Sequence, residues 1–404
     1  MDFPKVLSRF SSFGRSGLSS HFIKVHPQPK EEELFSSWFA RTAIANLSIP
    51  QSFASVYFGE YLSCILNDPD WGTLRLYEEV AKKVNFPFEK IFNLSLRTYE
   101  GLLFEDPGVY NNCKPFINPV KPVGGRFRKH GLRYCPECLK EENYFRKLWR
   151  ITFYTACLKH KVFLLDRCPE CGSPVTPLKW KLSVNHFHCF VCGFDFRKAT
   201  SEKVPKESKG LEVISYFLNV LNSGYFEFGG SKYYSIFYFK VIEHFLKVIY
   251  FMKRRNIRYL KREQELVGIK LSDKPKTKYY YDIPLKEQYI LFTTVGKVLR
   301  NKEELERFIV ENGLKKTELT RDFEDYPYWY SVIIDKYDNT SYKVSLQEII
   351  NAWSYLKKSQ NNVSLKDLKK LLGKDFNLKK RKDLKYLLYH LSSDKLYDLY
   401  YKLV

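Results

Sequence analysis

Apolar residues recur three and four positions apart through most of this chain, which is the spacing of one face of an α-helix. The first such pattern follows Pro29 and contains Leu34, Trp38, Phe39 and Ala43. Glutamates at its start suit the positive end of a helix dipole. The same spacing predicts a second helix that begins at Pro50 and carries Phe53, Val56, Tyr57 and Leu62. It also predicts helices over about 76–84, 88–92, 211–222, 235–259 and 284–299. The fold class is therefore predicted to be mainly α.

Polar residues mark helix ends in the last third of the chain. Asn301 with Glu304 predicts a capped helix start, and Asn312-Gly313 predicts the end of that helix. Three short helices follow. The first two begin at Ser345 and Ser364, and the third has its N-terminal end at Asn377–Lys382 and its apolar positions at Leu384, Leu387, Leu388 and Leu391. Short helices joined by tight turns predict a helix-turn-helix-like unit at the carboxyl end.

Eight cysteine and histidine residues fall into two sets with matched spacing. The first set is a Cys-x-x-Cys pair, 18 intervening residues and a Cys-x-x-His pair, and the second is two Cys-x-x-Cys pairs separated by 17 residues. Their members are Cys135, Cys138, Cys157 and His160 in the first set, and Cys168, Cys171, Cys189 and Cys192 in the second. This spacing is typical of two tetrahedral zinc sites. The segments Trp149–Tyr154 and Lys161–Leu165 suit the short strands of zinc ribbons.

Disulfides are the alternative use of these cysteines, and they need an oxidising compartment. The chain does not open with a secretory signal, so we expect a cytoplasmic protein with reduced cysteines. Four protein ligands leave no position open for water, so both zinc ions are predicted to be structural. Both ligand sets are complete without His186 and His188, which are therefore expected at the surface or behind the ligands. Cys64 and Cys113 are expected to be small buried residues.

The chain carries a formal net charge of +22, and basic residues are concentrated in two segments. Residues 253–262 hold six lysines and arginines and no acid, and residues 356–385 hold eleven against three aspartates. Concentrated positive charge indicates a polyanionic partner, and double-stranded DNA is the one we predict. The predicted DNA-contacting residues are Lys253, Arg254, Arg255 and Arg258, with Lys379, Lys380, Arg381 and Lys382 at the start of the last helix. A solvated face on an ordinary three-helix bundle is the alternative for the second group.

Two other classes of function fit the sequence less well. The most apolar run, Tyr233–Met252, is interrupted by charged residues and cannot span a bilayer cheaply, so no membrane role is expected. Gly296-Lys297 lacks the upstream glycine of a phosphate-binding loop. The carboxylates are scattered along the sequence. A nuclease whose acidic residues come together in the fold stays open as an alternative. We expect no enzymatic activity and no catalytic residue.

These patterns divide the chain into six segments. We predict a flexible arm over 1–26, a helical domain over 27–114, tandem zinc ribbons over 115–197, a linker over 198–210, a second helical domain over 211–340 and a basic helix-turn-helix-like domain over 341–404. The polar run at 198–210 is the clearest of the boundaries.

Four stretches together carry a family resemblance. They are Leu34–Arg41, reading LFSSWFAR, Leu132–Cys138, reading LRYCPEC, Trp149-Arg150 ahead of Cys157–His160, reading CLKH, and Cys168–Gly172, reading CPECG. These motifs resemble those of the TniQ/TnsD family, the target-site selectors of cut-and-paste bacterial transposons, including the CRISPR-associated ones. The similarity covers residues 27–197 and is weaker beyond them.

The resemblance implies an amino-terminal helix-turn-helix domain, zinc ribbons and an adaptor without catalysis. Such an adaptor marks the DNA insertion site and recruits a TnsC-like AAA+ regulator, which passes the site to the transposase. TnsD-like members bind a chromosomal sequence themselves, whereas TniQ proteins of CRISPR-associated elements dock, as homodimers in the best known cases, on an RNA-guided complex. The basic last third of this chain favours direct DNA binding. A transcription regulator with zinc ribbons and a helix-turn-helix is the alternative function.

Overall fold

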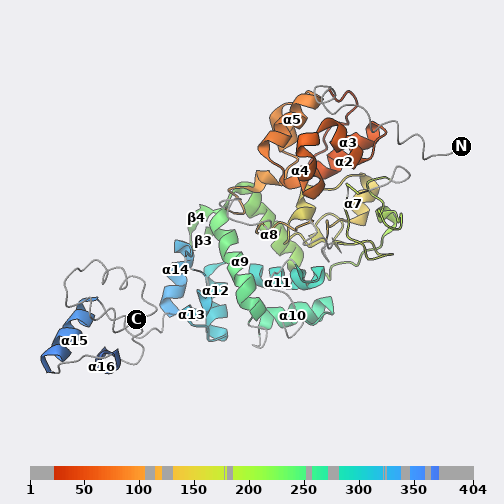
Figure 1. Cartoon of the computed structure of the whole chain (residues 1–404). Helices are drawn as coiled ribbons and strands as arrows, with labels where there is room; N and C mark the ends of the chain where they lie inside the picture. The colour runs from red at the N-terminus through yellow and green to blue at the C-terminus, as the bar shows by residue number, and fades with distance from the viewer. Residues whose placement is uncertain are drawn as a thin grey trace. The chain divides into compact units, whose positions relative to one another are not determined.

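The computed structural model describes residues 22–104, 114–120, 131–176, 178–179, 185–251, 257–271, 282–321, 323, 325–337, 346–359 and 365–372 (Figure 1). The chain divides into two compact units, Met1–Lys336 and Tyr337–Val404. The described part is mainly helical, with two short antiparallel strand pairs, which confirms the predicted fold class. None of the helices described is long and apolar enough to cross a membrane.

The amino-terminal part of the first unit is a cluster of short helices around an aromatic core. Its elements are α2 (Phe35–Ala45), α3 (Pro50–Tyr57), η1 (Gly59–Tyr61), α4 (Leu62–Asn67), η2 (Pro69–Trp71), α5 (Leu74–Val84), α6 (Phe88–Phe92) and η3 (Leu96–Tyr99). Trp38 and Phe39 of α2 are buried, as the helical spacing predicts, and Phe39 packs against Phe53 of α3. The second helix is shorter than its pattern indicates, because the backbone leaves the helical region at Phe58.

The next segment has little regular structure. It contains α7 (Pro136–Glu141), η4 (Lys147–Arg150), β1 (Ala156–Cys157), β2 (Val162–Phe163) and η5 (Phe196–Lys198). The strand predicted over 149–154 is wrong: residues 147–150 form a 3-10 turn, and only Ile151 makes a bridge, to Ile117. The turn is fixed by backbone bonds such as the one that the Ile151 amide donates to the Leu148 carbonyl.

The carboxyl half of the first unit is built around one buried helix. Its elements are α8 (Gly210–Ser223), β3 (Tyr225–Phe228), β4 (Ser231–Tyr234), α9 (Ser235–Phe251), α10 (Arg258–Val267), α11 (Leu285–Val298), α12 (Lys302–Glu311), α13 (Lys316–Leu319), α14 (Tyr328–Ile334) and η7 (Asp335–Tyr337). Helix α11 is buried on nearly every side and contacts α8, α9, α10 and α12. Gly296 permits its close approach to α8, since a Cβ there would lie 2.3 Å from Val213 Cγ1.

Several helix predictions in this half are confirmed. Asn301 caps α12 by accepting a hydrogen bond from the Glu304 amide at 2.8 Å, and Gly313 follows that helix with a left-handed φ of 57°. The helix predicted over 235–259 is wrong in its extent, because Ile257 is extended and a separate helix, α10, begins after it at Arg258. The β3–β4 hairpin, in register from Tyr225↔Tyr234 to Phe228↔Ser231, was not predicted.

Aromatic and polar contacts join the described segments of the first unit. Phe153 stacks on Phe239 of α9 with ring centroids 5.7 Å apart. The buried Arg133 donates to the Thr152 carbonyl at 2.7 Å and to Gln288 Oε1 of α11 at 2.5 Å. Residues 198–210, predicted as a linker, also pack here: the buried Ser208 donates to Glu263 Oε2 of α10 at 2.6 Å. The predicted domain boundaries stay predictions.

The second unit contributes two described helices, α15 (Leu346–Ser359) and α16 (Leu365–Leu372), which contact each other. Both fall where helices were predicted. The predicted caps Ser345 and Ser364 and the third helix of the helix-turn-helix-like unit lie outside the described residues.

A buried ion-pair network connects the amino-terminal helices to the segment that carries the cysteines. Arg150 is fully buried and contacts Asp68 Oδ2 and Asp70 Oδ2, each at 2.7 Å. Asp70 also accepts hydrogen bonds from the Ser36 amide at 2.6 Å and the Ser36 hydroxyl at 3.0 Å. Burial raises the pKa of Asp70 to about 7. The network therefore satisfies two carboxylates and a guanidinium that would otherwise be costly to bury.

We expect Arg150→Ala to lower the free energy of unfolding by about 3–5 kcal/mol, because it leaves Asp70 buried without its cation. The measurement is denaturant unfolding of the purified protein. Lys140→Ala is the matched control, since the Lys140–Glu137 pair is exposed on both sides and is expected to contribute below about 1 kcal/mol. Equal losses in the two variants would contradict this assignment.

Candidate metal centres and nucleic-acid interface

The first predicted ligand set comes together in the structure. Cys135 and Cys138 lie at the start of α7, where Pro136 occupies the first helical position. Cys157 ends β1, and His160 lies in the turn that leads to β2. The four ligand atoms lie within 4.8 Å of one another.

The geometry of this cluster fits a tetrahedral zinc ion. Tetrahedral coordination with Zn–S bonds of about 2.3 Å and a Zn–N bond of about 2.0 Å places two sulfurs about 3.8 Å apart and a sulfur and a nitrogen about 3.5 Å apart. Cys138 Sγ lies 3.6 Å from Cys157 Sγ. His160 Nδ1 lies 3.5, 3.3 and 3.6 Å from the sulfurs of Cys135, Cys138 and Cys157. His160 therefore presents Nδ1, and not Nε2, to the centre of the cluster.

The second predicted set also comes together, with all four sulfurs within 4.8 Å. Cys168 Sγ lies 3.6 Å from Cys192 Sγ, and Cys171 Sγ lies 3.5 Å from Cys189 Sγ. These distances again match the edge of a zinc tetrahedron. Both cysteine/histidine clusters fit zinc ions.

Three of the four ligand pairs share one turn. In each, the residue after the second ligand has a left-handed φ, and its amide donates to the carbonyl of the first ligand. These residues are Lys161 (φ 55°, 2.8 Å), Gly172 (φ 68°, 3.0 Å) and Gly193 (φ 77°, 2.9 Å). The turn points both ligand side chains to one side, and glycine adopts its last position without strain. The Cys135–Cys138 pair instead opens a helix.

The two clusters differ in their exposure to solvent. The three cysteines of the first cluster are buried, whereas Cys171 and Cys192 of the second are exposed. Hydrogen bonds from the thiols of Cys135 and Cys138 hold the pKa of Cys157 far below its usual range. The pKa values of the other two thiols, Cys135 and Cys138, are raised. The first cluster is therefore shielded from solvent, with one of its three cysteines favouring the thiolate form that binds metal.

The remaining histidines and cysteines lie outside both clusters. The expectation that His186 is a surface or ligand-supporting residue is wrong, because it is buried against Phe145 and its Nε2 lies 2.9 Å from the Asn143 carbonyl. Burial lowers its pKa to about 4. His188 is half-buried, with Nε2 4.0 Å from Asp195 Oδ2. Cys64 is half-buried, and Cys113 lies outside the described residues.

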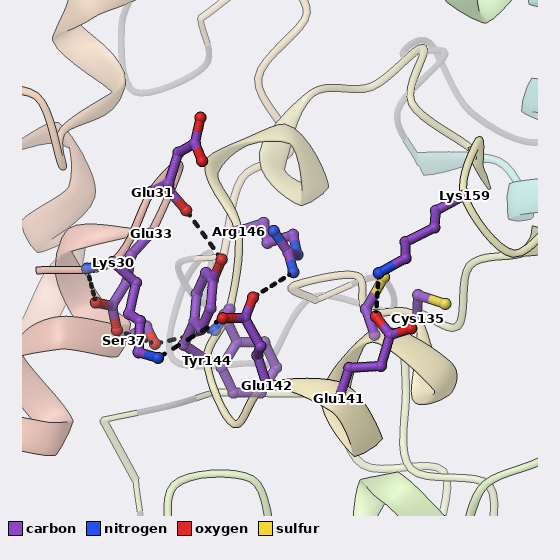
Figure 2. A network of polar contacts seen from close by, with 12 residues as sticks. Lys30, Glu31, Glu33, Ser37, Cys135, Glu141, Glu142, Tyr144, Arg146 and Lys159 are labelled. Carbon is purple, nitrogen blue, oxygen red and sulfur yellow. Dashed lines mark hydrogen bonds and ion pairs between the residues drawn. The ribbon is translucent and has the colours of Figure 1, made fainter.

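A short segment connects the first cluster to the amino-terminal helices, as Figure 2 shows. The Tyr144 hydroxyl donates to the Glu31 carbonyl at 3.0 Å, and the Phe145 amide donates to Ser37 Oγ of α2 at 3.0 Å. Ser37 in turn donates to the buried Glu33, at 3.0 Å. Because α7 ends at Glu141, three residues before Tyr144, the position of the cluster is tied to the start of α2.

Arg258 is the one residue among the predicted DNA contacts that falls in the described part of the chain. It begins α10 and is exposed, and Lys261 and Arg262 are exposed on the same face, three and four positions later. The opposite face of α10 buries Leu260 and Glu263. Lys253, Arg254 and Arg255 lie outside the described residues, as do Lys379, Lys380, Arg381 and Lys382.

The helices and the two cysteine clusters define a class: a mainly helical protein with two Cys/His clusters that fit zinc ions. Comparison with protein families adds a second finding: residues 24–164 match the TniQ family, so this part of the chain is similar to a TniQ domain. The match spans the amino-terminal helices and the whole first cluster. A TniQ domain associates the chain with target-site selection in transposition. A search of curated proteins finds no match.

The difference in exposure predicts an order of thiol reactivity. In the protein as purified, without chelation, iodoacetamide is expected to label Cys171 and Cys192 before Cys135, Cys138 and Cys157, because a reagent reaches exposed sulfurs without any opening of the fold. Peptide mass spectrometry at successive times gives the order. Cys168 and Cys189 are the internal control: they belong to the second cluster but are buried, so they are expected to react more slowly than Cys171 and Cys192. Faster labelling of the first cluster would contradict the burial assigned here.

Proposed function

We propose that this protein is a non-catalytic adaptor that selects DNA target sites for a transposon, stabilised by two structural zinc ions. The TniQ match is the observation that carries the proposal, because it covers the helices and the first metal cluster together. The adaptor would mark the insertion site and recruit an AAA+ regulator and, through it, the transposase. The match favours this function over the zinc-ribbon transcription regulator.

The zinc ions in this proposal have a structural role. Each cluster offers four protein ligands, so a bound ion would have no open position for a water nucleophile. Cys135, Cys138, Cys157 and His160 would hold one ion, and Cys168, Cys171, Cys189 and Cys192 the other. The two strands beside the first cluster are two residues long, too short to hold this segment by themselves.

Elemental analysis of the purified protein is expected to give about two zinc ions per chain. Cys168→Ser is expected to lose one of them and several kcal/mol of stability, since metal binding contributes directly to folding in such sites. Cys64→Ser is the control, because Cys64 belongs to neither cluster. Retention of both ions and full stability by Cys168→Ser would contradict the second centre.

The direct DNA-binding form of the proposal rests on α10. Arg258, Lys261 and Arg262 form an exposed row on one face of this helix, and positively charged rows of this kind bind phosphates. The sequence adds further basic side chains at 253–255 and 379–382. Docking on an RNA-guided CRISPR complex, with a homodimer of this chain, is the other route to the target within the same function.

We expect binding to duplex DNA to weaken steeply with salt. Replacing Arg258, Lys261 and Arg262 together by Gln should lower the slope of log K against log salt by about 2–3, since each phosphate contact contributes about 0.9. The exposed lysines Lys82, Lys203 and Lys206, replaced together by Gln, give a control with the same charge change. Fluorescence anisotropy measures both.

Three outcomes of this experiment separate the alternatives. Equal slopes for the two triple variants would contradict a contact through α10. Absence of binding at low salt would remove the direct route and leave docking on a guide complex. Cleavage of the DNA in the presence of magnesium would contradict the adaptor itself.

A further inference from the structure

The last residue of α7, Glu141, faces the histidine of the first cluster from outside. Its Oε1 lies 3.2 Å from His160 Nε2, and its Oε2 accepts a hydrogen bond from Lys159 Nζ at 2.6 Å. Glu141 is not one of the four ligands. Figure 2 shows the contact between the Glu141 carboxylate and Lys159.

The two nitrogens of His160 therefore have different surroundings. Nδ1 points to three sulfurs, and Nε2 points to a carboxylate. A nitrogen that binds a metal must offer a lone pair, so the proton of the neutral ring has to be on Nε2. A carboxylate at hydrogen-bond distance stabilises that tautomer and fixes the plane of the ring.

We propose that Glu141 is a positioning residue of the first metal centre, one that selects the tautomer and orientation in which His160 binds zinc through Nδ1. This inference rests on the proposed function insofar as that function includes zinc at this cluster. Lys159 orients the carboxylate by holding its other oxygen.

The solvent exposure of the Lys159–Glu141 ion pair indicates whether Glu141 acts mainly on folding stability or on zinc affinity. Side chains of Lys159 and Glu141 are 64% and 40% exposed, and ion pairs in water contribute little to folding. A carboxylate behind a ligating histidine, by contrast, changes metal affinity by about 10–100-fold. The effect of Glu141 is therefore expected on zinc affinity at the first site, and not on the second cluster, which has no histidine ligand.

The test is a double-mutant cycle in the full-length protein, read as zinc affinity of each site by chelator competition. Glu141→Ala is expected to weaken the first site about 10–100-fold, and Glu141→Gln less, because its amide oxygen still accepts a hydrogen bond from Nε2. In a His160→Cys background, which replaces the imidazole by a thiolate, Glu141→Ala is expected to change nothing. The exposed Lys140→Ala serves as the control for a lost surface charge.

Equal losses in the wild-type and His160→Cys backgrounds, or no loss in either, would overturn the inference, because Glu141 would then not act through the imidazole.

Should His160→Cys fail to fold, nitrogen NMR of His160 decides the matter in the zinc-loaded protein. Glu141→Ala should shift the Nε2 resonance and Lys140→Ala should not; an unchanged resonance overturns the inference. A wild-type protein without zinc at the first site contradicts the proposed centre as well, whereas two ions with equal losses contradict the role of Glu141 alone.

Discussion

The convergence of four ligand atoms at each cluster is the constraint on which residues 131–198 depend. The described part of this segment has two-residue strands and helices of at most six residues in place of extended secondary structure. Its chain direction is set instead by tight turns whose amides bond back to the first ligand, with Gly172 and Gly193 in the left-handed conformation. A segment of this kind obtains its rigidity from cross-links between distant residues, and closed metal sites supply them without requiring a large hydrophobic core.

Buried charges then attach this segment to its helical neighbours. Arg150 reaches Asp68 and Asp70 beside the amino-terminal helices, and Arg133 reaches Gln288 of α11. Both arginines are almost completely buried, and each lies within the residue range of the cysteine-bearing segment. Arginine suits this position, because its planar group can satisfy several acceptors at once. The segment therefore contacts both helical regions through buried polar groups, and loss of either arginine would leave buried acceptors without their donor.

The parts of the structure that depend on local sequence were predictable, and those that depend on distant partners were not. Ligand spacing places Cys135 near His160, and the cap at Asn301 needs only the next three residues. Arg150 and Asp70 are 80 residues apart, and neither stands in a pattern that marks it as buried. The β3–β4 hairpin escaped prediction because aromatic residues occupy both its faces, which hides the alternation: Phe226 is buried while Tyr225 and Tyr234 are exposed.

A distant partner also makes the charge on the exposed face of α10 differ from the net charge counted from its sequence. The helix carries two glutamates against three basic residues, which by sequence is nearly neutral. Glu263, however, is fully buried, where it accepts a hydrogen bond from Ser208 and pairs with Lys297 of α11 at 2.5 Å. That carboxylate anchors the helix and contributes little negative potential to its outer face. The exposed face therefore has three cations and one carboxylate. This face is more basic than the net charge of the helix indicates, and it is the face that a polyanion would meet.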